Sequence, residues 1–255
     1  GPDTEIALPS GALLTVSPDG AYTYDPNGAV AGADDVFQVR VTDGSQTQSP
    51  GTFPASIALA DLDGSDGFRL DGIDAFDLSG RSVSGAGDVN GDGFDDVIIG
   101  APSLYNSSVG ESYVVFGSDT GFGDSLDLGA LDGSDGFRLD GVGAYDLSGV
   151  SVSGAGDVNG DGLDDLIIGA FFASPDSNSY AGESYVVFGR DTETEGDFEA
   201  SLDLGALDGS DGFRLDGVDA GDGSGFSVSG AGDVNGDGLD DLIIGAYRAN
   251  SSAGE

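Results

Sequence analysis

The sequence predicts an all-β fold built from tandem, four-stranded antiparallel units, and three observations carry this prediction. First, 47 of the 255 residues are glycine, many of them beside Asp or Asn, where tight turns form. Second, runs of about four to eight residues rich in Val, Ile, Tyr and Phe have the composition of short strands. Third, the same blocks of sequence return along the chain. No stretch has the apolar periodicity of a long amphipathic helix.

A repeated unit organises most of the chain. The block LDGSDGFRLDG occurs at residues 62–72, 131–141 and 207–217, so its copies are 69 and then 76 residues apart. Four antiparallel strands in each tandem unit are typical of a propeller blade, whereas most solenoid repeats are shorter and contain fewer strands. The extra seven residues of the longer repeat fall in two polar segments, 171–181 and 191–199, which we expect to be surface loops.

Each repeat contains four expected strands, in the order SVSGAGDV, DDVIIGA or DDLIIGA, ESYVVFG and GFRLDG. The SVSGAGDV strands lie at residues 82–89, 151–158 and 227–234, and the second strands at 95–101, 164–170 and 240–246. The ESYVVFG strands lie at residues 111–117 and 183–189, and the GFRLDG strands at 67–72, 136–141 and 212–217. The third ESYVVFG block is cut off after Gly254 and Glu255. Because a propeller ring closes with about four blades or more, we expect an open arc of three blades.

Residues 1–51 have a different pattern. Three expected strands, LPSGALLTV, PDGAYTYDPNG and DDVFQVRVTDG, lie at residues 8–16, 18–28 and 34–44 and are separated by Asp-Gly and Asn-Gly turns. They predict a separate small β-region before the repeats. Since the sequence starts with Gly and contains no Met, we expect a fragment or a processed chain, with any signal peptide upstream.

Composition excludes several functions. The chain has a formal charge of −40 and contains no His, Cys, Lys, Met or Trp. Without His or Cys there is no Ser-His-Asp triad, cysteine nucleophile or His/Cys zinc site, and without Lys there is no P-loop or Schiff base. A surface with this much negative charge repels the phosphate backbones of nucleic acids. We therefore expect no nucleic-acid partner. No apolar run approaches the roughly 20 residues that span a bilayer, so we expect no membrane insertion.

The motif GDVNGDGxDD, present three times, carries the chemistry. Its spacing D-x-N-x-D-G-x-x-D places side-chain oxygens at loop positions 1, 3, 5 and 9 and a backbone carbonyl at position 7, which is how a chain surrounds a hard cation. The predicted ligands are Asp88, Asn90, Asp92, the carbonyl of Phe94 and Asp96; Asp157, Asn159, Asp161, the carbonyl of Leu163 and Asp165; and Asp233, Asn235, Asp237, the carbonyl of Leu239 and Asp241. We expect about three Ca²⁺ ions.

The predicted ion and its affinity follow from departures from the EF-hand loop. Position 12 is isoleucine in every copy, so the bidentate Glu is absent, and strands flank the loop in place of helices. We therefore expect weak binding, with Kd about 10⁻⁴ to 10⁻³ M, and calcium in preference to magnesium, which demands a small rigid octahedron. The alternative is that Asn-Gly and Asp-Gly only form hairpin turns. Turn chemistry explains the glycines but not a carboxylate at position 9 in all three copies.

Two other repeated patterns have simpler expected roles. The LDGSDG segments, the first at residues 62–67, are expected to be turns in preference to further cation sites. Arg69, Arg138 and Arg214 recur in GFRLDG and are expected to pair with an Asp on the same sheet. The remaining acidic side chains are expected to form a solvated surface suited to salty water.

The order Ser-Gly-x-Ser-Val, GDVNGDGxDD and IIGAP resembles the FG-GAP repeat of integrin alpha-subunit β-propellers and of many secreted bacterial proteins. The resemblance covers residues 52–255, in repeats at about 52–121, 122–197 and 198–255. Ser-Gly replaces the "FG", and "GAP" survives only in the first copy. Residues 1–51 resemble the C-terminal part of a VCBS or bacterial cadherin-like module. The implied fold is a partial β-propeller of four-stranded antiparallel blades, preceded by a partial β-sandwich.

The resemblance implies a calcium-binding, non-catalytic propeller segment of a secreted or cell-surface adhesin-like protein, acting as scaffold and interaction surface. The alternative is an accessory region of a larger secreted hydrolase whose catalytic domain lies elsewhere. An enzyme here would need a carboxylate pair, as in glycosidases, but every prominent acidic cluster lies in a predicted metal loop. We expect no enzymatic activity, an extracellular location, a protein or carbohydrate ligand at the cell surface, and self-association through open blade edges.

Overall fold

The computed structural model describes residues 58–64, 67–103 and 108–249, together with three short strands near the N-terminus. The chain divides into two compact units, Gly1–Ser56 and Ile57–Glu255. In the first unit, β1 (Thr4–Ala7), β2 (Leu13–Val16) and β3 (Tyr22–Asp25) form an antiparallel sheet in that order.

Two of these three strands lie where the sequence predicts strands. β2 falls within residues 8–16 and β3 within residues 18–28. β1 was not predicted, because four residues with charged Glu5 among them are too few to show a convincing alternation. The expected strand at residues 34–44 lies outside the described residues.

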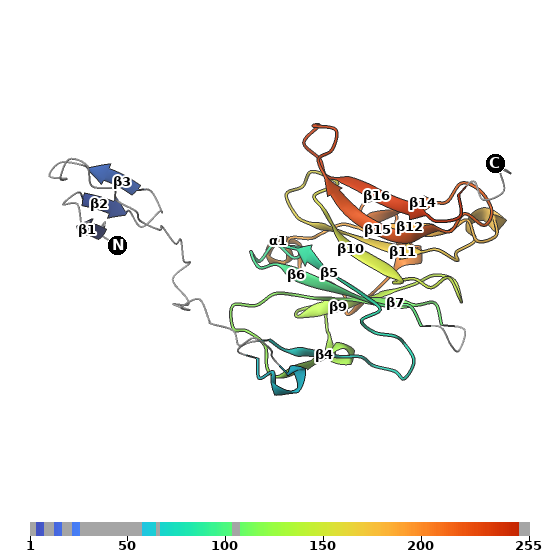
Figure 1. Ribbon diagram of the computed structural model, residues 1–255, viewed down its shortest axis with the longest axis horizontal. Coiled ribbons are helices and arrows are strands. Elements are labelled where there is room, and N and C mark those ends of the chain that lie inside the picture. Colours follow the sequence, from blue (N-terminus) through green and yellow to red (C-terminus); the bar gives the residue numbers. More distant parts are fainter. Residues whose placement is uncertain are drawn as a thin grey trace. The chain divides into compact units, whose positions relative to one another are not determined.

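Two complete blades, each a meander of four antiparallel strands, form the centre of the second unit (Figure 1). The first blade contains β5 (Ser82–Gly87), β6 (Asp96–Ala101), β7 (Glu111–Val115) and β9 (Gly136–Asp140), and the second contains β10 (Ser151–Gly156), β11 (Asp165–Ala170), β12 (Glu183–Val187) and β14 (Gly212–Asp216). The predicted four-stranded unit is confirmed in both blades.

Further strands extend this arrangement at its margins. β15 (Ser224–Gly232) and β16 (Asp241–Ala246) form the described part of a third blade. β13 (Ser201–Asp203) runs parallel to β9 along the outer edge of the first blade, and β8 (Ser125–Asp127) runs parallel to β4 (Arg69–Asp71) in the same way. Short helical turns are η1 (Leu59–Asp61), η2 (Leu128–Ala130), η3 (Pro175–Ser177), η4 (Leu204–Ala206) and α1 (Thr192–Glu195).

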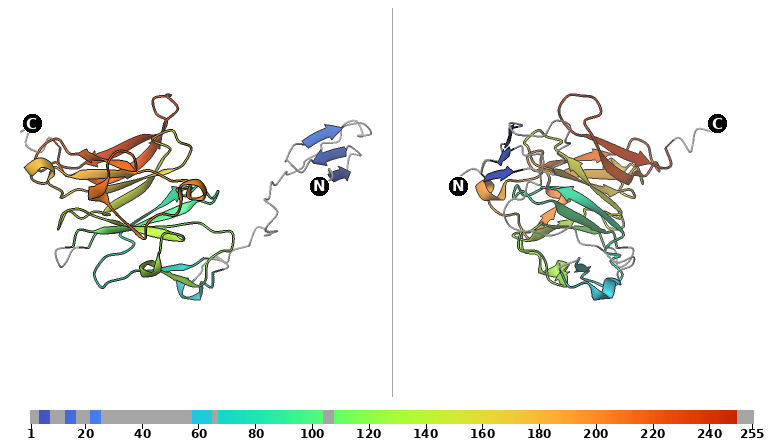
Figure 2. Two further views of the ribbon diagram at one scale, coloured as in Figure 1. Left: turned by 180° about the vertical axis from the view of Figure 1, so that it is seen from behind. Right: turned by 60° about the vertical axis from the view of Figure 1, so that its left-hand side comes forward.

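Apolar side chains between successive sheets form the cores. Because side chains alternate along a strand, Ile98 and Ile99 of β6 face opposite ways. Ile98 packs in a cluster with Leu166 of the second blade, whereas Ile99 packs with Leu128 on the β4–β8 side. Ile167 of β11 packs in a third cluster against the third blade. The sheets therefore stack in chain order, from β4 at one end to β15 and β16 at the other, as Figures 1 and 2 show.

Equivalent positions show that the described stack is open at both ends. Ile98 and Ile167 are completely buried, but Ile243, the same position in the third blade, is 61% exposed. At the other end Val83 is 67% exposed, whereas the equivalent Val152 is 6% exposed. The described sheets thus leave the face around Ile243 uncovered at one end. At the other end, β4 and β8 cover the first blade around Ile99 but leave the area around Val83 uncovered, and the described sheets do not close into a ring.

The predicted arginine pairs are present. The Nε atoms of the three arginines lie 2.6 Å from an Asp oxygen two residues further along the strand, in the pairs Arg69–Asp71, Arg138–Asp140 and Arg214–Asp216. The first and third pairs are exposed, so each adds little to stability, whereas the Arg138–Asp140 pair is half-buried. The LDGSDG segments form turns, as predicted: Gly133 N donates to Gly136 O and Gly209 N to Gly212 O, both at 2.9 Å.

Candidate metal centre

The acidic motifs lie where the first strand of each blade turns into the second. Loop 1 (residues 88–96) joins β5 to β6, loop 2 (157–165) joins β10 to β11, and loop 3 (233–241) joins β15 to β16. A register shift near the end of each first strand releases the chain from the sheet just before its loop. The predicted position between the first two strands is confirmed.

Asp88 organises the backbone of loop 1. Its Oδ1 accepts hydrogen bonds from Gly91 N at 2.8 Å and Asp92 N at 3.1 Å, and its Oδ2 accepts one from Gly93 N at 2.9 Å. Gly91 and Gly93 have φ values of +78° and +88°, a region that residues with a Cβ rarely adopt. The two glycines therefore let the chain curl around the carboxylate at position 1.

The next two predicted ligands belong to the same network. Asn90 Oδ1 accepts from Asp92 N at 3.0 Å, and Asp92 Oδ1 accepts from Phe94 N at 2.9 Å. The Asn90 amide also donates to Asp92 Oδ2 at 2.9 Å. Asn90 is buried whereas Asp92 is exposed. Positions 1, 3 and 5 thus direct oxygens into one short loop, and Phe94, whose carbonyl is the predicted ligand at position 7, follows directly.

Asp96, at position 9, closes the loop from the sheet side. Its side chain is 1% exposed, with Oδ2 accepting from Val89 N at 2.9 Å and Oδ1 from Gly117 N at 2.8 Å. Gly117 follows β7, the third strand of the blade. A Cβ there would lie 2.6 Å from Phe94 Cβ, so the approach requires glycine. The third strand therefore helps to build the loop between the first two.

The second loop repeats the first, and the third departs from it. Asp157 and Asp161 accept the same backbone hydrogen bonds as their counterparts, and Asp165 accepts from Val158 N and Gly189 N, both at 2.9 Å. In loop 3, Asp233 and Asp237 keep this pattern, with Leu239 N donating to Asp237 at 3.0 Å. In loop 3 the Asn235 amide instead donates to Asp241 Oδ1 at 3.2 Å. In loops 1 and 2 the equivalent Oδ1 accepts from the N–H of the glycine that follows the third strand.

The buried carboxylates at position 9 lie in an unfavourable electrostatic environment. Burial, with a smaller contribution from the charges of Asp92 and Asp88, raises the pKa of Asp96 to about 7, although hydrogen bonds from two backbone N–H groups lower it. Burial likewise raises the pKa of Asp165 to about 6. Neither side chain forms an ion pair in the described part of the chain.

This donor set fits a hard cation. Buried carboxylates are stable when they are paired or bind a metal, and oxygen is the ligand that calcium and magnesium take. Each loop offers carboxylate and amide oxygens from four side chains within nine residues. In the described residues the carboxylates lie against backbone N–H groups, and no three acidic side chains are gathered closely enough to hold a metal. The fit therefore rests on donor chemistry and loop conformation.

Two features of the site were not predicted from sequence. One is the glycine after the third strand, Gly117 or Gly189, whose N–H binds the carboxylate at position 9. The other is Asp164 and Asp240 at position 8, which contact the loop of the preceding blade. The repeated GESYVVFG block and the repeated Asp-Asp doublet were the available signals, but neither indicates which backbone group lies opposite.

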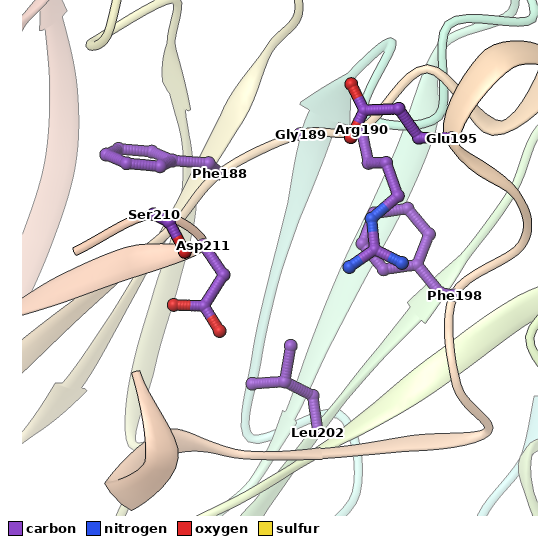
Figure 3. A pocket seen from close by; sticks show the side chains of 8 residues that line it. All are labelled: Phe188, Gly189, Arg190, Glu195, Phe198, Leu202, Ser210 and Asp211. Atoms are coloured by element: carbon purple, nitrogen blue, oxygen red, sulfur yellow. The ribbon is translucent and has the colours of Figure 1, made fainter. Parts of the chain in front are cut away.

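The segment at residues 191–199, predicted to be a surface loop, is mostly exposed and contains one short helical turn that was not predicted. Asp191 caps the single helical turn α1 by accepting from Glu193 N and Thr194 N. A groove of about 320 Å³ lies beside this segment, lined by Phe188, Gly189, Arg190, Glu195, Phe198, Leu202, Ser210 and Asp211. The Arg190 guanidinium lies over the Phe198 ring, 4.8 Å from its centre (Figure 3). Residues 191–199 thus pack beside the residues that directly follow β12.

An all-β stack of four-stranded blades, each with an acidic loop between its first two strands, defines a β-propeller segment. In agreement, the chain matches the FG-GAP repeat at residues 79–115, 148–187 and 224–255, and the bacterial Ig domain at residues 3–56. The chain therefore contains three FG-GAP repeats, as its motifs predicted. The N-terminal match agrees with the predicted bacterial cadherin-like module.

Similar proteins include integrin alpha chains and a phospholipase D. Integrin alpha pat-2 of Caenorhabditis elegans is 33% identical over 123 residues, covering 48% of this chain and 9% of that protein. Integrin alpha-IIb of Homo sapiens is 30% identical over 185 residues, covering 72% and 16%. Phosphatidylinositol-glycan-specific phospholipase D of Bos taurus is 30% identical over 165 residues, covering 62% and 17%. The chain thus spans less than a fifth of each relative.

Proposed function

We propose that this chain is a calcium-binding, non-catalytic propeller segment of a secreted or cell-surface adhesin-like protein, where it acts as scaffold and interaction surface. One observation carries the proposal: an oxygen-rich loop, whose position-1 Asp accepts the same backbone hydrogen bond in all three copies, follows the first strand of each described blade. The similarity to integrin alpha chains supports the extracellular location and a protein or carbohydrate ligand at the cell surface.

The proposed ions are about three Ca²⁺, one in each loop. Their ligands would be the side chains at positions 1, 3, 5 and 9 and the backbone carbonyl at position 7: Asp88, Asn90, Asp92, Phe94 and Asp96; Asp157, Asn159, Asp161, Leu163 and Asp165; Asp233, Asn235, Asp237, Leu239 and Asp241. A bound divalent cation supplies positive charge beside carboxylates that otherwise repel one another. This offsets the cost of burying the carboxylate at position 9.

The proposed organisation follows the two sequence patterns. Residues 1–51 would form part of a sandwich module, and residues 52–255 three FG-GAP repeats at about 52–121, 122–197 and 198–255. Each complete blade takes its fourth strand, β9 or β14, from the start of the next repeat. The charge of −40 disfavours a nucleic-acid partner. No helix in the described part of the chain is long and apolar enough to cross a membrane.

A second candidate function is an accessory FG-GAP region of a larger secreted hydrolase. The similarity to a phospholipase D specific for phosphatidylinositol-glycan favours it, because the matched region is only 17% of that enzyme. The two functions differ in what adjoins the repeats in the complete polypeptide. A hydrolase domain encoded in the same open reading frame would favour the second function, and further adhesion modules would favour the first.

The calcium loops are tested by a matched pair of variants. Asp92→Ala removes the position-5 ligand of loop 1 and is expected to leave two calcium sites. Asp95→Ala removes a neighbouring carboxylate that is exposed and lies outside the ligand series, and is expected to leave three. Titration calorimetry of both variants and the parent chain measures the numbers. An equal loss of calcium in the two variants would contradict the ligand assignment.

We also propose that the chain associates head to tail with a second copy of itself. The uncovered faces carry Ile243 at one end and Val83 at the other, and two different faces meet in a heterologous contact. The charge of −40 opposes this encounter at low salt, and added salt screens the repulsion.

Light scattering across a sodium chloride series at constant calcium is expected to show a mass that increases with salt. Ile243→Ser is expected to reduce this increase. Val218→Ser, which alters a side chain that is 83% exposed in the loop between β14 and β15, is expected to leave it unchanged. A compact monomer at every salt concentration would show that the two faces do not associate.

A further inference from the structure

The first Asp of each Asp-Asp doublet contacts the loop of the preceding blade. Asp164, at position 8 of loop 2, accepts a hydrogen bond from Asp88 N at 2.9 Å through its Oδ2, and its own N–H donates to Asp88 O at 3.2 Å. Asp240 binds Asp157 in the same way, with both hydrogen bonds at 3.0 Å. Two blade junctions thus contain an identical two-point bridge to the residue at position 1 of a loop.

The glycine before each loop makes room for this bridge. A Cβ on Gly87 would overlap the Asp164 carboxylate, and one on Gly156 would overlap that of Asp240. Both glycines also have positive φ, at +76° and +74°. In loops 1 and 2, the Gly-Asp pair at the start of the loop therefore contacts the following blade in addition to forming its own turn.

The extent of these contacts differs between the loops. Loop 1 is also held by residues that follow β12, since Arg190 N donates to Val89 O at 2.9 Å and Thr192 N donates to Asn90 O at 3.0 Å. The side chain at loop position 3 is buried in loop 1, where it is Asn90, but exposed in loops 2 and 3. Among the described residues, loop 3 has no following blade.

We infer that Asp164 and Asp240 are positioning residues for the calcium sites of loops 1 and 2, so that each of these sites is completed by the next blade. This inference rests on the proposed calcium function. The bridge fixes the backbone at position 1, whose carboxylate is both a proposed ligand and the acceptor of three backbone N–H groups in its loop. A ligand held in place before binding loses less conformational freedom on binding. Affinity therefore decreases in the order loop 1, loop 2, loop 3.

A through-space effect of charge must be separated from positioning. Removing a carboxylate near a cation site weakens cation binding by Coulomb attraction alone. Asp164→Asn removes the charge but keeps an oxygen that accepts the hydrogen bond from Asp88 N, whereas Asp164→Ala removes both. Positioning predicts that the asparagine variant retains most of the affinity lost in the alanine variant.

The test is calcium titration calorimetry on the whole chain, with Asp95→Ala as the matched control at the same position of the first doublet. Asp164→Ala is expected to weaken one site by about 10- to 100-fold, as is typical for partners that orient metal ligands. Asp164→Asn and Asp95→Ala are expected to stay close to the parent. In an Asp92→Ala background, which lacks the loop 1 site, Asp164→Ala is expected to leave the two remaining affinities unchanged.

The outcomes separate this inference from the proposed function. A parent chain that binds no calcium contradicts the proposed function itself. If the parent chain binds three ions, three results overturn the inference alone. The first is that Asp164→Ala binds calcium as tightly as the parent; the second is that Asp164→Ala weakens calcium binding equally in the parent and in the Asp92→Ala background. The third is that Asp164→Asn loses as much calcium affinity as Asp164→Ala. If circular dichroism shows that Asp164→Ala does not fold, Asp240→Ala provides the same test for loop 2, with Asp161→Ala as its background.

Discussion

Removal of calcium is expected to lower the melting temperature of this chain by about 10 to 30 °C. With Kd values of about 10⁻⁴ to 10⁻³ M and calcium at about 10 mM, each site that exists only in the folded state adds about 1.4 to 2.7 kcal/mol. Three independent sites add about 4 to 8 kcal/mol. In a unit of this size, 1 kcal/mol corresponds to about 2 to 4 °C.

The physical reason is the like charge that each loop gathers. Asp88, Asp92 and Asp96 lie on one short loop, and the pKa of Asp96 is raised to about 7 by burial and by its acidic neighbours. A bound cation favours the ionised carboxylates, and chelation leaves their repulsion uncompensated.

Differential scanning calorimetry with excess chelator measures this shift. The control is magnesium at the concentration and ionic strength of the calcium sample, which is expected to recover only part of the shift because magnesium demands a small octahedral site. Superimposable melting curves with calcium and with chelator would show that the loops fold without a cation.

Ile167→Ala is expected to destabilise the chain by about 2 to 5 kcal/mol, whereas Ile243→Ala is expected to change stability by less than about 0.5 kcal/mol. The two residues occupy the same position in successive second strands. Ile167 is completely buried between the second and third blades, in a cluster with Val186 and Val228, and its truncation leaves a cavity. Ile243 is 61% exposed, so its truncation removes little buried surface.

Thermal and denaturant unfolding of the two variants at saturating calcium measures the difference. Ile98→Ala, at the completely buried equivalent position in the first blade, is expected to resemble Ile167→Ala. Similar losses for Ile167→Ala and Ile243→Ala would mean that the uncovered face of the third blade is covered in solution. In that case the losses are expected to become unequal at low protein concentration, where self-association is weaker.

The blades and the positions of the acidic loops could be predicted because both are local and repeated. Four-stranded units were visible in the recurring blocks, and the spacing of Asp88, Asn90, Asp92 and Asp96 is contained in nine residues. The structure then places these residues in the turn between β5 and β6. A structural feature formed by residues close together in the sequence can thus be predicted before the fold is known.

Contacts between blades could not be predicted in the same way. Asp164 and Asp88 are 76 residues apart, and only the stacking of the sheets brings them together. The parallel pairing of β13 with β9 also depends on the path of the chain from the second blade back to the first. The helical turn α1 was missed because TETE is too short for a periodic signal. The contacts of the second blade with loop 1, such as the one between Asp164 and Asp88, are therefore not predictable from sequence alone.

Calorimetric titration of the whole, previously chelated chain with calcium is the most direct test of cation binding by the three loops. We expect about three bound ions, with Kd values near 10⁻⁴ to 10⁻³ M and the tightest site lost in Asp92→Ala. Absence of calcium binding at millimolar concentrations, in a chain that circular dichroism shows to be folded, would contradict it: the loops would then be hairpin turns with acidic side chains and no bound cation.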